Sequence, residues 1–76
     1  MDEEVCLGKY RHYKGNFYEV IGVGRHSETL EEVVVYRALY ESDEFGKEAI
    51  WVRPKKMFFE RVVVDGKEVR RFTSIE

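Results

Sequence analysis

Two side chains that could act together in a reaction, His26 and Ser27, are neighbours in the segment 25–29. A histidine can take the proton of a serine hydroxyl and so convert the serine into a nucleophile. Adjacent side chains on an extended chain point to opposite sides, so His26 is badly placed to act as a base for Ser27 unless the segment bends sharply. A serine that closes a turn by bonding its own backbone is far more common. We therefore predict no catalytic residue in this segment.

The same segment offers several hydrogen-bond donors that could converge on one ligand. Small β-domains usually bind through their loops, and a cationic side chain adds charge-assisted bonds to an anion. The alternative is a loop held by local ion pairs with Glu28 and Glu31, each worth about 0–1 kcal/mol when exposed. The ligand-binding candidates in this segment are Arg25, His26, Ser27 and Thr29.

A second group of candidates lies in two β-favouring runs further along the chain. Arg37 is the only charged residue in the run 33–40, and a cation on a mostly apolar face needs a carboxylate, a carbonyl or a ligand. Trp51 and Arg53 share a strand face and could supply a stacking wall and an anion contact, although a small domain needs its large aromatic residues in the core. The candidates in this group are Tyr36, Arg37, Trp51 and Arg53.

The sequence lacks the motifs of common enzyme and metal sites. Gly22-Val23-Gly24 is not followed by the Lys-Ser/Thr pair of a phosphate-binding loop. Cys6, His12 and His26 are the only candidate soft metal ligands, and their spacing is not that of a zinc site. We therefore expect no metal and no cofactor, and we favour a protein without enzymatic activity. The alternative is a small hydrolase or transferase acting on a nucleotide-like substrate, with His12 or His26 as acid or base.

Strands must position these side chains, and the run 32–40 is the longest β-favouring stretch of the chain. A period of two places the uncharged residues Val34, Tyr36, Ala38 and Tyr40 on one face. The other face carries Val33, Val35, Arg37 and Leu39. A strand that is apolar on nearly both faces is usually interior to a sheet, so we expect this run to be central.

The remaining elements are short and separated by turn residues. We predict strands at 8–13, 17–24 and 48–53, loops at 25–31 and 41–47, and one 3₁₀ turn at 54–57. Gly22 and Gly24 indicate a bulge or a bend in the second strand. Asp65-Gly66 predicts a type I′ hairpin between 58–64 and 67–72, with cross-strand pairs Val62–Val69, Glu60–Arg71 and Phe59–Phe72.

This layout predicts an all-β fold, namely a small five- to six-stranded SH3-like barrel with one short 3₁₀ turn. An OB-type barrel is the main alternative, but such a barrel normally has a helix between its third and fourth strands, and the sequence predicts none there. We expect one domain at 8–72, an N-terminal segment at 1–7 and a C-terminal tail at 73–76. An exposed edge strand could pair across a two-fold axis, so a monomer and a homodimer both remain open.

Composition limits the possible partners and compartments. The formal net charge of −2 argues against nucleic acid as the partner, because such binders normally have a basic footprint, although a nucleic-acid accessory domain remains an alternative. Cys6 is the single cysteine, which favours a reducing compartment. We see no signal peptide, and no stretch approaches the ~20 apolar residues that span a membrane, so we expect a cytoplasmic protein without membrane contact.

Several motifs together resemble a family of small bacterial proteins, domain-of-unknown-function family 1653 (DUF1653). They are Gly8 to Gly15, Tyr18-Glu19-Val20, Arg25 to Thr29, Val34 to Arg37, Trp51 to Pro54 and Met57-Phe58. The resemblance covers about residues 8–72 and implies a mostly β, cytoplasmic bacterial domain without implying an activity. Our prediction is a non-enzymatic binding module for a polar or anionic small ligand or a peptide.

Overall fold

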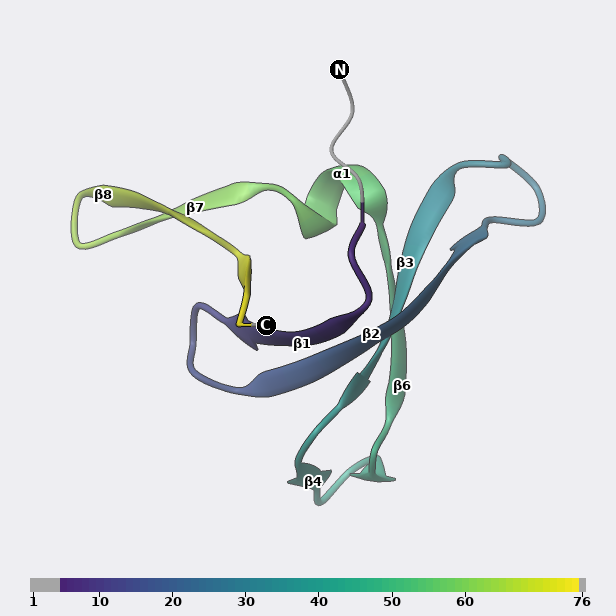
Figure 1. Ribbon diagram of the computed structural model, residues 1–76, viewed down its shortest axis with the longest axis horizontal. Coiled ribbons are helices and arrows are strands. Elements are labelled where there is room, and N and C mark those ends of the chain that lie inside the picture. The colour runs from purple at the N-terminus through teal and green to yellow at the C-terminus, as the bar shows by residue number, and fades with distance from the viewer. Residues whose placement is uncertain (1–4, 76) are drawn as a thin grey trace.

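The computed structural model describes residues 5–75, which form mainly β-strands (Figure 1). Five strands make one antiparallel sheet in the order β6-β3-β2-β1-β9. They are β1 (Gly8–His12), β2 (Phe17–Arg25), β3 (Glu32–Ala38), β6 (Ile50–Pro54) and β9 (Phe72–Ser74). The predicted all-β class is confirmed. Part of the predicted N-terminal segment, residues 1–4, lies outside the described residues, and the predicted tail begins inside β9.

The strand β3 lies between β2 and β6, which confirms the interior position expected of a strand that is apolar on nearly both faces. Val34, Tyr36 and Ala38 are buried, as the period of two predicts. The core cluster consists of Tyr10, Val20, Val34, Tyr36, Phe58 and Phe72. We call the face of the sheet that carries this cluster the inner face and the opposite face the outer face.

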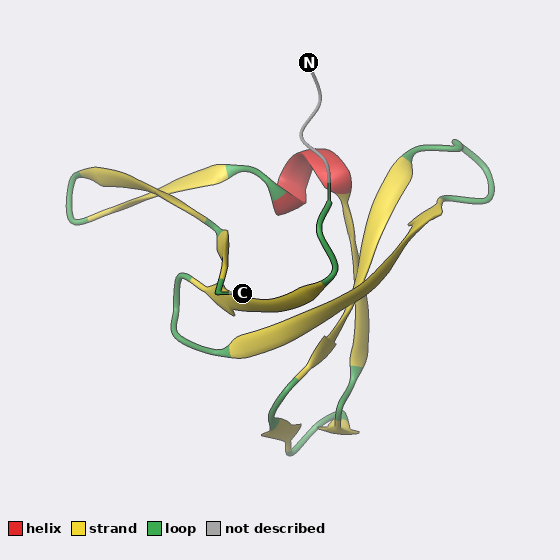
Figure 2. Cartoon of the chain, in the orientation of Figure 1, coloured by secondary structure: helices red, strands yellow, loops and turns green. Residues whose placement is uncertain are grey.

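The second strand bends where the sequence places its glycines. Val20 pairs with Tyr36 and Gly22 pairs with Val35, so Ile21 is an extra residue and the ladder contains a bulge. This confirms the irregularity expected at Gly22. A bulge increases the local twist, and Figure 2 shows β2 and β3 running diagonally to a projecting loop.

Two small hairpins stand apart from the main sheet. Within the predicted loop 41–47, β4 (Glu41–Ser42) pairs with β5 (Gly46–Lys47). The second hairpin joins β7 (Arg61–Val64) to β8 (Lys67–Arg70), and the predicted pair Val62–Val69 is confirmed. Figure 1 shows this second hairpin extending away from the sheet.

The predicted hairpin is longer than the observed one, because the β7–β8 ladder ends at the pair Arg61–Arg70. The backbone N–H of Arg71 still donates to the carbonyl of Glu60 at 3.2 Å, and their side chains form an ion pair at 2.9 Å. Phe72, however, does not face Phe59 in a ladder. It pairs with His12 in β1, because its ring completes the core against Phe58. Burial of Phe72 therefore determines where the hairpin ends.

The turn of this hairpin depends on two residues with positive φ. Asp65 has φ 50° and Gly66 has φ 78°, as a type I′ turn requires. We expect Gly66→Ala to lower the free energy of unfolding by about 1 kcal/mol, because a Cβ disfavours this conformation. Gly22→Ala is the matched control, because a Cβ meets nothing within 4 Å at either glycine and only Gly66 has a positive φ. Urea denaturation of both variants checks this, and equal losses would contradict it.

The predicted 3₁₀ turn at 54–57 is instead one α-helical turn, α1 (Lys55–Phe58). The N–H of Phe59 donates to the carbonyl of Lys55 at 3.2 Å, which is the α-helical spacing. Only the last bond, from Glu60 to Met57, has 3₁₀ spacing. The wider turn places Phe58 over the sheet, where it is buried, and four residues are too few for a sequence pattern to distinguish the two pitches.

The sheet is open. The strand order ends at β6 on one side and β9 on the other, and no ladder joins these two strands within residues 5–75. The predicted closure into a barrel therefore remains a prediction. None of the described helices has the length and apolar character needed to cross a membrane.

Candidate functional site

The loop between β2 and β3 uses its polar groups to close on itself. Arg25 donates from Nη1 to the carbonyl of Leu30 at 2.8 Å. His26 Nδ1 accepts from the backbone N–H groups of Glu28 and Thr29 at 3.1 and 3.3 Å. Leu30 has φ 62° and donates to the carbonyl of His26 at 2.8 Å. Bonds to the backbone, rather than ion pairs, therefore hold this loop.

The two hydroxyl groups of the loop differ, because Thr29 bonds to the backbone of the loop and Ser27 is exposed. Thr29 Oγ1 accepts from the backbone N–H of Glu31 at 3.2 Å. Ser27 is exposed within the turn. The loop thus already uses three of the four side chains predicted to face a ligand: Arg25, His26 and Thr29.

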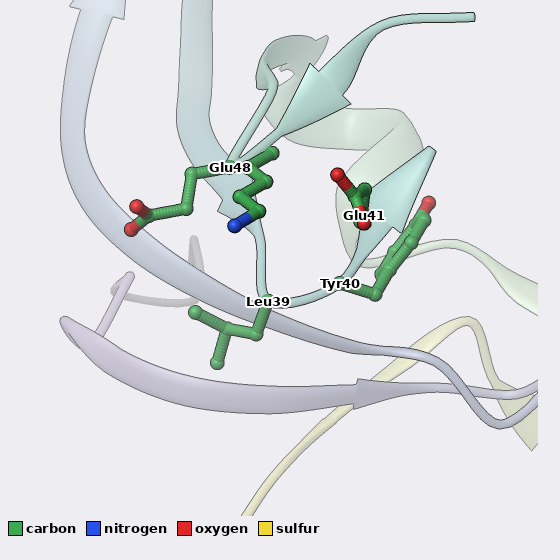
Figure 3. Close-up of a pocket in the computed structure, with 5 residues that line it drawn as sticks. Leu39, Tyr40, Glu41 and Glu48 are labelled. Atoms are coloured by element: carbon green, nitrogen blue, oxygen red, sulfur yellow. The ribbon is translucent and has the colours of Figure 1, made fainter. Parts of the chain in front are cut away.

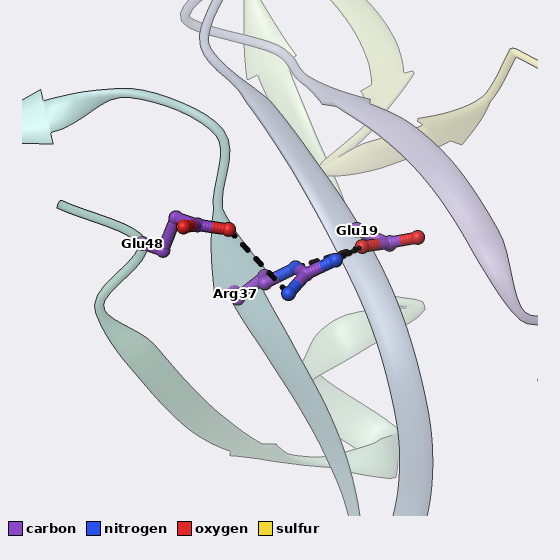
Figure 4. Close-up of polar contacts among 3 residues, drawn as sticks. All are labelled: Glu19, Arg37 and Glu48. Atoms are coloured by element: carbon purple, nitrogen blue, oxygen red, sulfur yellow. Dashed lines mark hydrogen bonds and ion pairs between the residues drawn. The ribbon is translucent and has the colours of Figure 1, made fainter.

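Arg37 lies on the outer face between two carboxylates (Figure 4). Its Nε donates to Glu19 Oε1 at 2.7 Å, and its Nη2 contacts the same oxygen. Its Nη1 lies 3.4 Å from Glu48 Oε1. Of the three kinds of partner expected for Arg37, the chain itself supplies carboxylates, so this guanidinium does not depend on a ligand.

Arg53 has a different environment, on the inner face. Its Nε donates to the Tyr36 hydroxyl at 3.4 Å, and its guanidinium carbon lies 5.9 Å from the centre of the Phe72 ring. No carboxylate of residues 5–75 lies within ion-pair distance of it. Arg53 is half-buried, so its charge is partly removed from water while its partners are neutral. Such a cation favours the approach of an anion.

The Phe72 ring beside this guanidinium packs among three other aromatic rings. The Phe72 ring lies 4.9 Å from the ring of His12, 5.4 Å from Tyr36 and 5.7 Å from Tyr18. These four residues and Arg53 are the Arg53 cluster. They come from β1, β2, β3, β6 and β9, so the whole sheet contributes to it.

Two tyrosine hydroxyls extend the polar part of the cluster. The hydroxyls of Tyr18 and Tyr40 are 2.8 Å apart. Burial raises the pKa of Tyr18 well above its usual value, and the hydrogen bond with Tyr40 adds to this rise. Tyr18 therefore stays neutral and can act as a hydrogen-bond donor.

The pKa of His12 depends on burial and on the cations near the Arg53 cluster. Burial lowers its pKa, and the nearby cations Arg53, Arg71 and Lys14 lower it further. Its Nδ1 accepts from the backbone N–H of Lys14 at 3.2 Å. Arg71 is paired with Glu60, yet its Nε is buried and finds no partner among the described residues. Three cations, Arg53, Arg71 and Lys14, therefore act on this histidine.

This shift predicts a pH dependence of stability. The pKa of His12 is lower in the folded state than its value of about 6.5 in the unfolded chain, so protonation favours unfolding. The free energy of unfolding should therefore fall as the pH drops below about 6.5, through the folded-state pKa. Urea denaturation across this range should show a smaller fall for His12→Gln than for the wild type. Identical pH profiles would contradict it.

Trp51 lies next to the cluster on the same face of β6. It packs against the core, and its ring centre is 5.0 Å from that of Phe45. Its indole N–H is buried and has no hydrogen-bond partner in the described part of the chain. A buried donor without a partner costs about 1–3 kcal/mol.

A shallow hollow of about 250 Å³ lies at the β3–β6 connection, lined by Leu39, Tyr40, Glu41, Lys47 and Glu48. Figure 3 shows Tyr40 and Glu41 pointing away from Leu39 and Glu48. These side chains do not converge, so the hollow is a weak candidate for a binding site. No group of three potential metal ligands occurs within residues 5–75.

The predicted site residues therefore occupy three places. Arg25, His26, Ser27 and Thr29 lie in the β2–β3 loop, Arg37 lies on the outer face, and Tyr36, Trp51 and Arg53 lie together on the inner face. Sequence reasoning did not include His12, Tyr18 or Phe72 in the site. A period of two places them on strand faces, but only the strand order shows that these faces meet.

Comparisons with known proteins give a consistent result. A family model described as a protein of unknown function, DUF1653, matches residues 8–74. The crystal structure of a protein belonging to the same family from Bordetella bronchiseptica has 33% sequence identity and a TM-score of 0.84. The similarity covers 95% of this chain and 88% of that one. No curated protein matches the chain.

Proposed function

This chain belongs to the DUF1653 family of proteins of unknown function, and we propose that it is a non-enzymatic binding module for an anionic ligand. The ligand is a small molecule with a phosphate or carboxylate group, or a peptide that presents one. The observation that carries the proposal is the environment of Arg53, a half-buried guanidinium whose partners are a hydroxyl and an aromatic ring.

The surroundings of Arg53 support an anion in two further ways. Burial is the main cause of the lowered pKa of His12, but Arg53, Arg71 and Lys14 lower it further, and a bound anion would oppose the effect of these cations. The rings of Tyr36 and Phe72 exclude water from one side of the guanidinium, which strengthens its electrostatic interactions. Arg53 would hold the anionic group, and the tyrosine hydroxyls would supply neutral hydrogen bonds.

The alternative of a hydrolase or transferase has less support. It requires a histidine within reach of a serine or a carboxylate. Nδ1 of His26 is occupied by the backbone of its own loop, and Nδ1 of His12 is occupied by the N–H of Lys14. The remaining nitrogen of His12 lies among aromatic rings and cations, where a general base is hard to protonate.

A nucleic-acid accessory domain also has less support. Such a domain needs a continuous basic surface. Several cations of this chain are instead paired with carboxylates: Arg37 with Glu19 and Glu48, Lys55 with Glu32, Arg61 with Glu68, and Arg71 with Glu60.

We also propose that the domain works in a bacterial cytoplasm. Its single cysteine, Cys6, is free and exposed, which fits a reducing compartment, and the similar crystal structure is of a protein from Bordetella bronchiseptica.

Thermal-shift screening tests the proposal. Nucleotides, phosphosugars, inorganic phosphate and carboxylate-terminated peptides would be screened against the wild type and Arg53→Gln. A ligand at ~100 times its dissociation constant adds ~2.7 kcal/mol, which in a domain of this size raises Tm by about 10 °C or more. We expect one class to stabilise the wild type and not Arg53→Gln. Stabilisation that is lost in Arg25→Gln instead would place the site in the β2–β3 loop.

A further inference from the structure

We propose that a second copy of this chain pairs with the free edge of β6, antiparallel across a two-fold axis. The first observation is topological. β6 is the last strand on its side of the sheet, and it pairs only with β3 among the described strands. An edge strand presents unpaired backbone groups, which are a template for another strand.

The hydrogen-bond phase shows which backbone groups are free. The N–H of Ala38 donates to the carbonyl of Ala49 at 2.9 Å, so this pair is a bonded one. Bonded and non-bonded pairs alternate in an antiparallel ladder. The registered pairs Tyr36–Trp51 and Val34–Arg53 are therefore bonded, and the backbone groups of Ile50, Val52 and Pro54 point away from β3.

Two features of the sequence fit this phase. Pro54 has no N–H to donate. Because its backbone groups point away from β3, the missing donor removes no hydrogen bond to β3. The side chains of Ile50 and Val52 lie on the outer face and are 57% and 63% exposed. Ile21 and Leu39 are further exposed apolar side chains of the chain. An apolar edge strand with free backbone groups is normally covered in a native protein.

The sequence of β6 is complementary to itself in one register. When Val52 faces Val52 across the two-fold axis, Ile50 faces Pro54 and Trp51 faces Arg53 of the second copy. Four backbone hydrogen bonds form, two between the Val52 residues and two from Ile50 N–H to the carbonyl of Pro54. The outer-face pairs are apolar, and the inner-face pairs bring a guanidinium to an indole.

Charge selects this register over its neighbour. Arg53 is the only charged residue of β6, and in the register centred on Val52 each Arg53 faces an indole. In the neighbouring register, in which Arg53 faces Arg53, like charges meet across the axis. The register centred on Val52 therefore pairs β6 with itself without opposing like charges, and this self-complementarity identifies the occupant as a second copy.

Two variants that place opposite charges at position 52 test the proposal by sedimentation equilibrium. We expect the wild type at twice the chain mass of 9.1 kDa. Val52→Glu and Val52→Lys should each be monomeric, because like charges would face each other across the axis. An equimolar mixture should recover the dimer mass, because glutamate then faces lysine. Val63→Glu, at a 72% exposed position in β7, is the control and should remain dimeric.

Amide hydrogen exchange tests the same contact without a substitution. In a concentrated sample the amides of Ile50 and Val52 should be protected, and dilution should remove this protection while leaving Trp51 unchanged. A wild type of 9.1 kDa at millimolar concentration would overturn the proposal. So would a dimer that persists in both Val52 variants, or a mixture that stays monomeric. None of these results depends on the ligand of the Arg53 cluster.

Discussion

Phe58→Ala is expected to leave the domain largely unfolded at 25 °C. Phe58 is 1% exposed, and its ring stacks on Phe72 with centres 4.4 Å apart. It also contacts the rings of Tyr10 and Tyr36. Truncation of such a phenylalanine costs about 3–5 kcal/mol, while a single core in a chain of this length supplies only ~3–5 kcal/mol in total. One substitution therefore removes most of the stability.

Urea denaturation followed by circular dichroism measures this effect, at a fixed protein concentration so that association does not change the result. Phe45→Ala is the matched control, because Phe45 is 57% exposed and lies outside the core cluster, with its ring against that of Trp51. We expect a loss of about 1 kcal/mol or less for this variant. Similar midpoints for the two variants would show that α1 does not close the core as described.

Arg53→Gln is expected to have the largest effect on ligand binding. Hydrogen bonds to a charged group contribute about 1.5–3 kcal/mol, so the dissociation constant of an anion at the Arg53 cluster should rise about 10- to 150-fold. Folding should change little, because Arg53 bonds a neutral hydroxyl and stacks on a ring. Calorimetric titration with the anion found by screening measures the change.

The same variant has a second readout that a merely structural role would not give. Arg53 is the first of the cations that depress the pKa of His12, so its removal should raise this pKa. Titration of the His12 ring by NMR measures it. Arg11→Gln is the matched control, since Arg11 is an exposed arginine in β1 and faces Phe17 in the neighbouring strand. Equal affinities for the two variants would exclude Arg53 as the anion contact.

The sequence was most informative where local pattern and burial agree. Val34, Tyr36 and Ala38 alternate with residues of the outer face, and this period alone places the central strand and its core face correctly. Asp65-Gly66 sets the register of β7 and β8, because few residue pairs adopt a type I′ turn. The bulge near Gly22 was likewise visible as glycines within a strand.

The sequence was least informative where distant segments meet. Phe72 leaves the hairpin to pair with β1, because a core of aromatic rings gains more from it than a ladder does. Arg37 and Arg53 look alike as cations in apolar strands, yet one meets two carboxylates and the other a hydroxyl. The neighbours in each case come from strand order, which no local pattern contains. This is why the predicted site divides into three parts.

An NMR titration of the ¹⁵N-labelled wild type with inorganic phosphate, and then with acetate, tests the central claim most directly. These are the simplest phosphoryl and carboxylate anions. We predict saturable shifts at the Arg53 side-chain Nε–H and at the Trp51 indole N–H, whose nitrogen is buried without a partner. Shifts confined to the β2–β3 loop, or no shifts with either anion, would contradict the assignment of the Arg53 cluster as an anion-binding site.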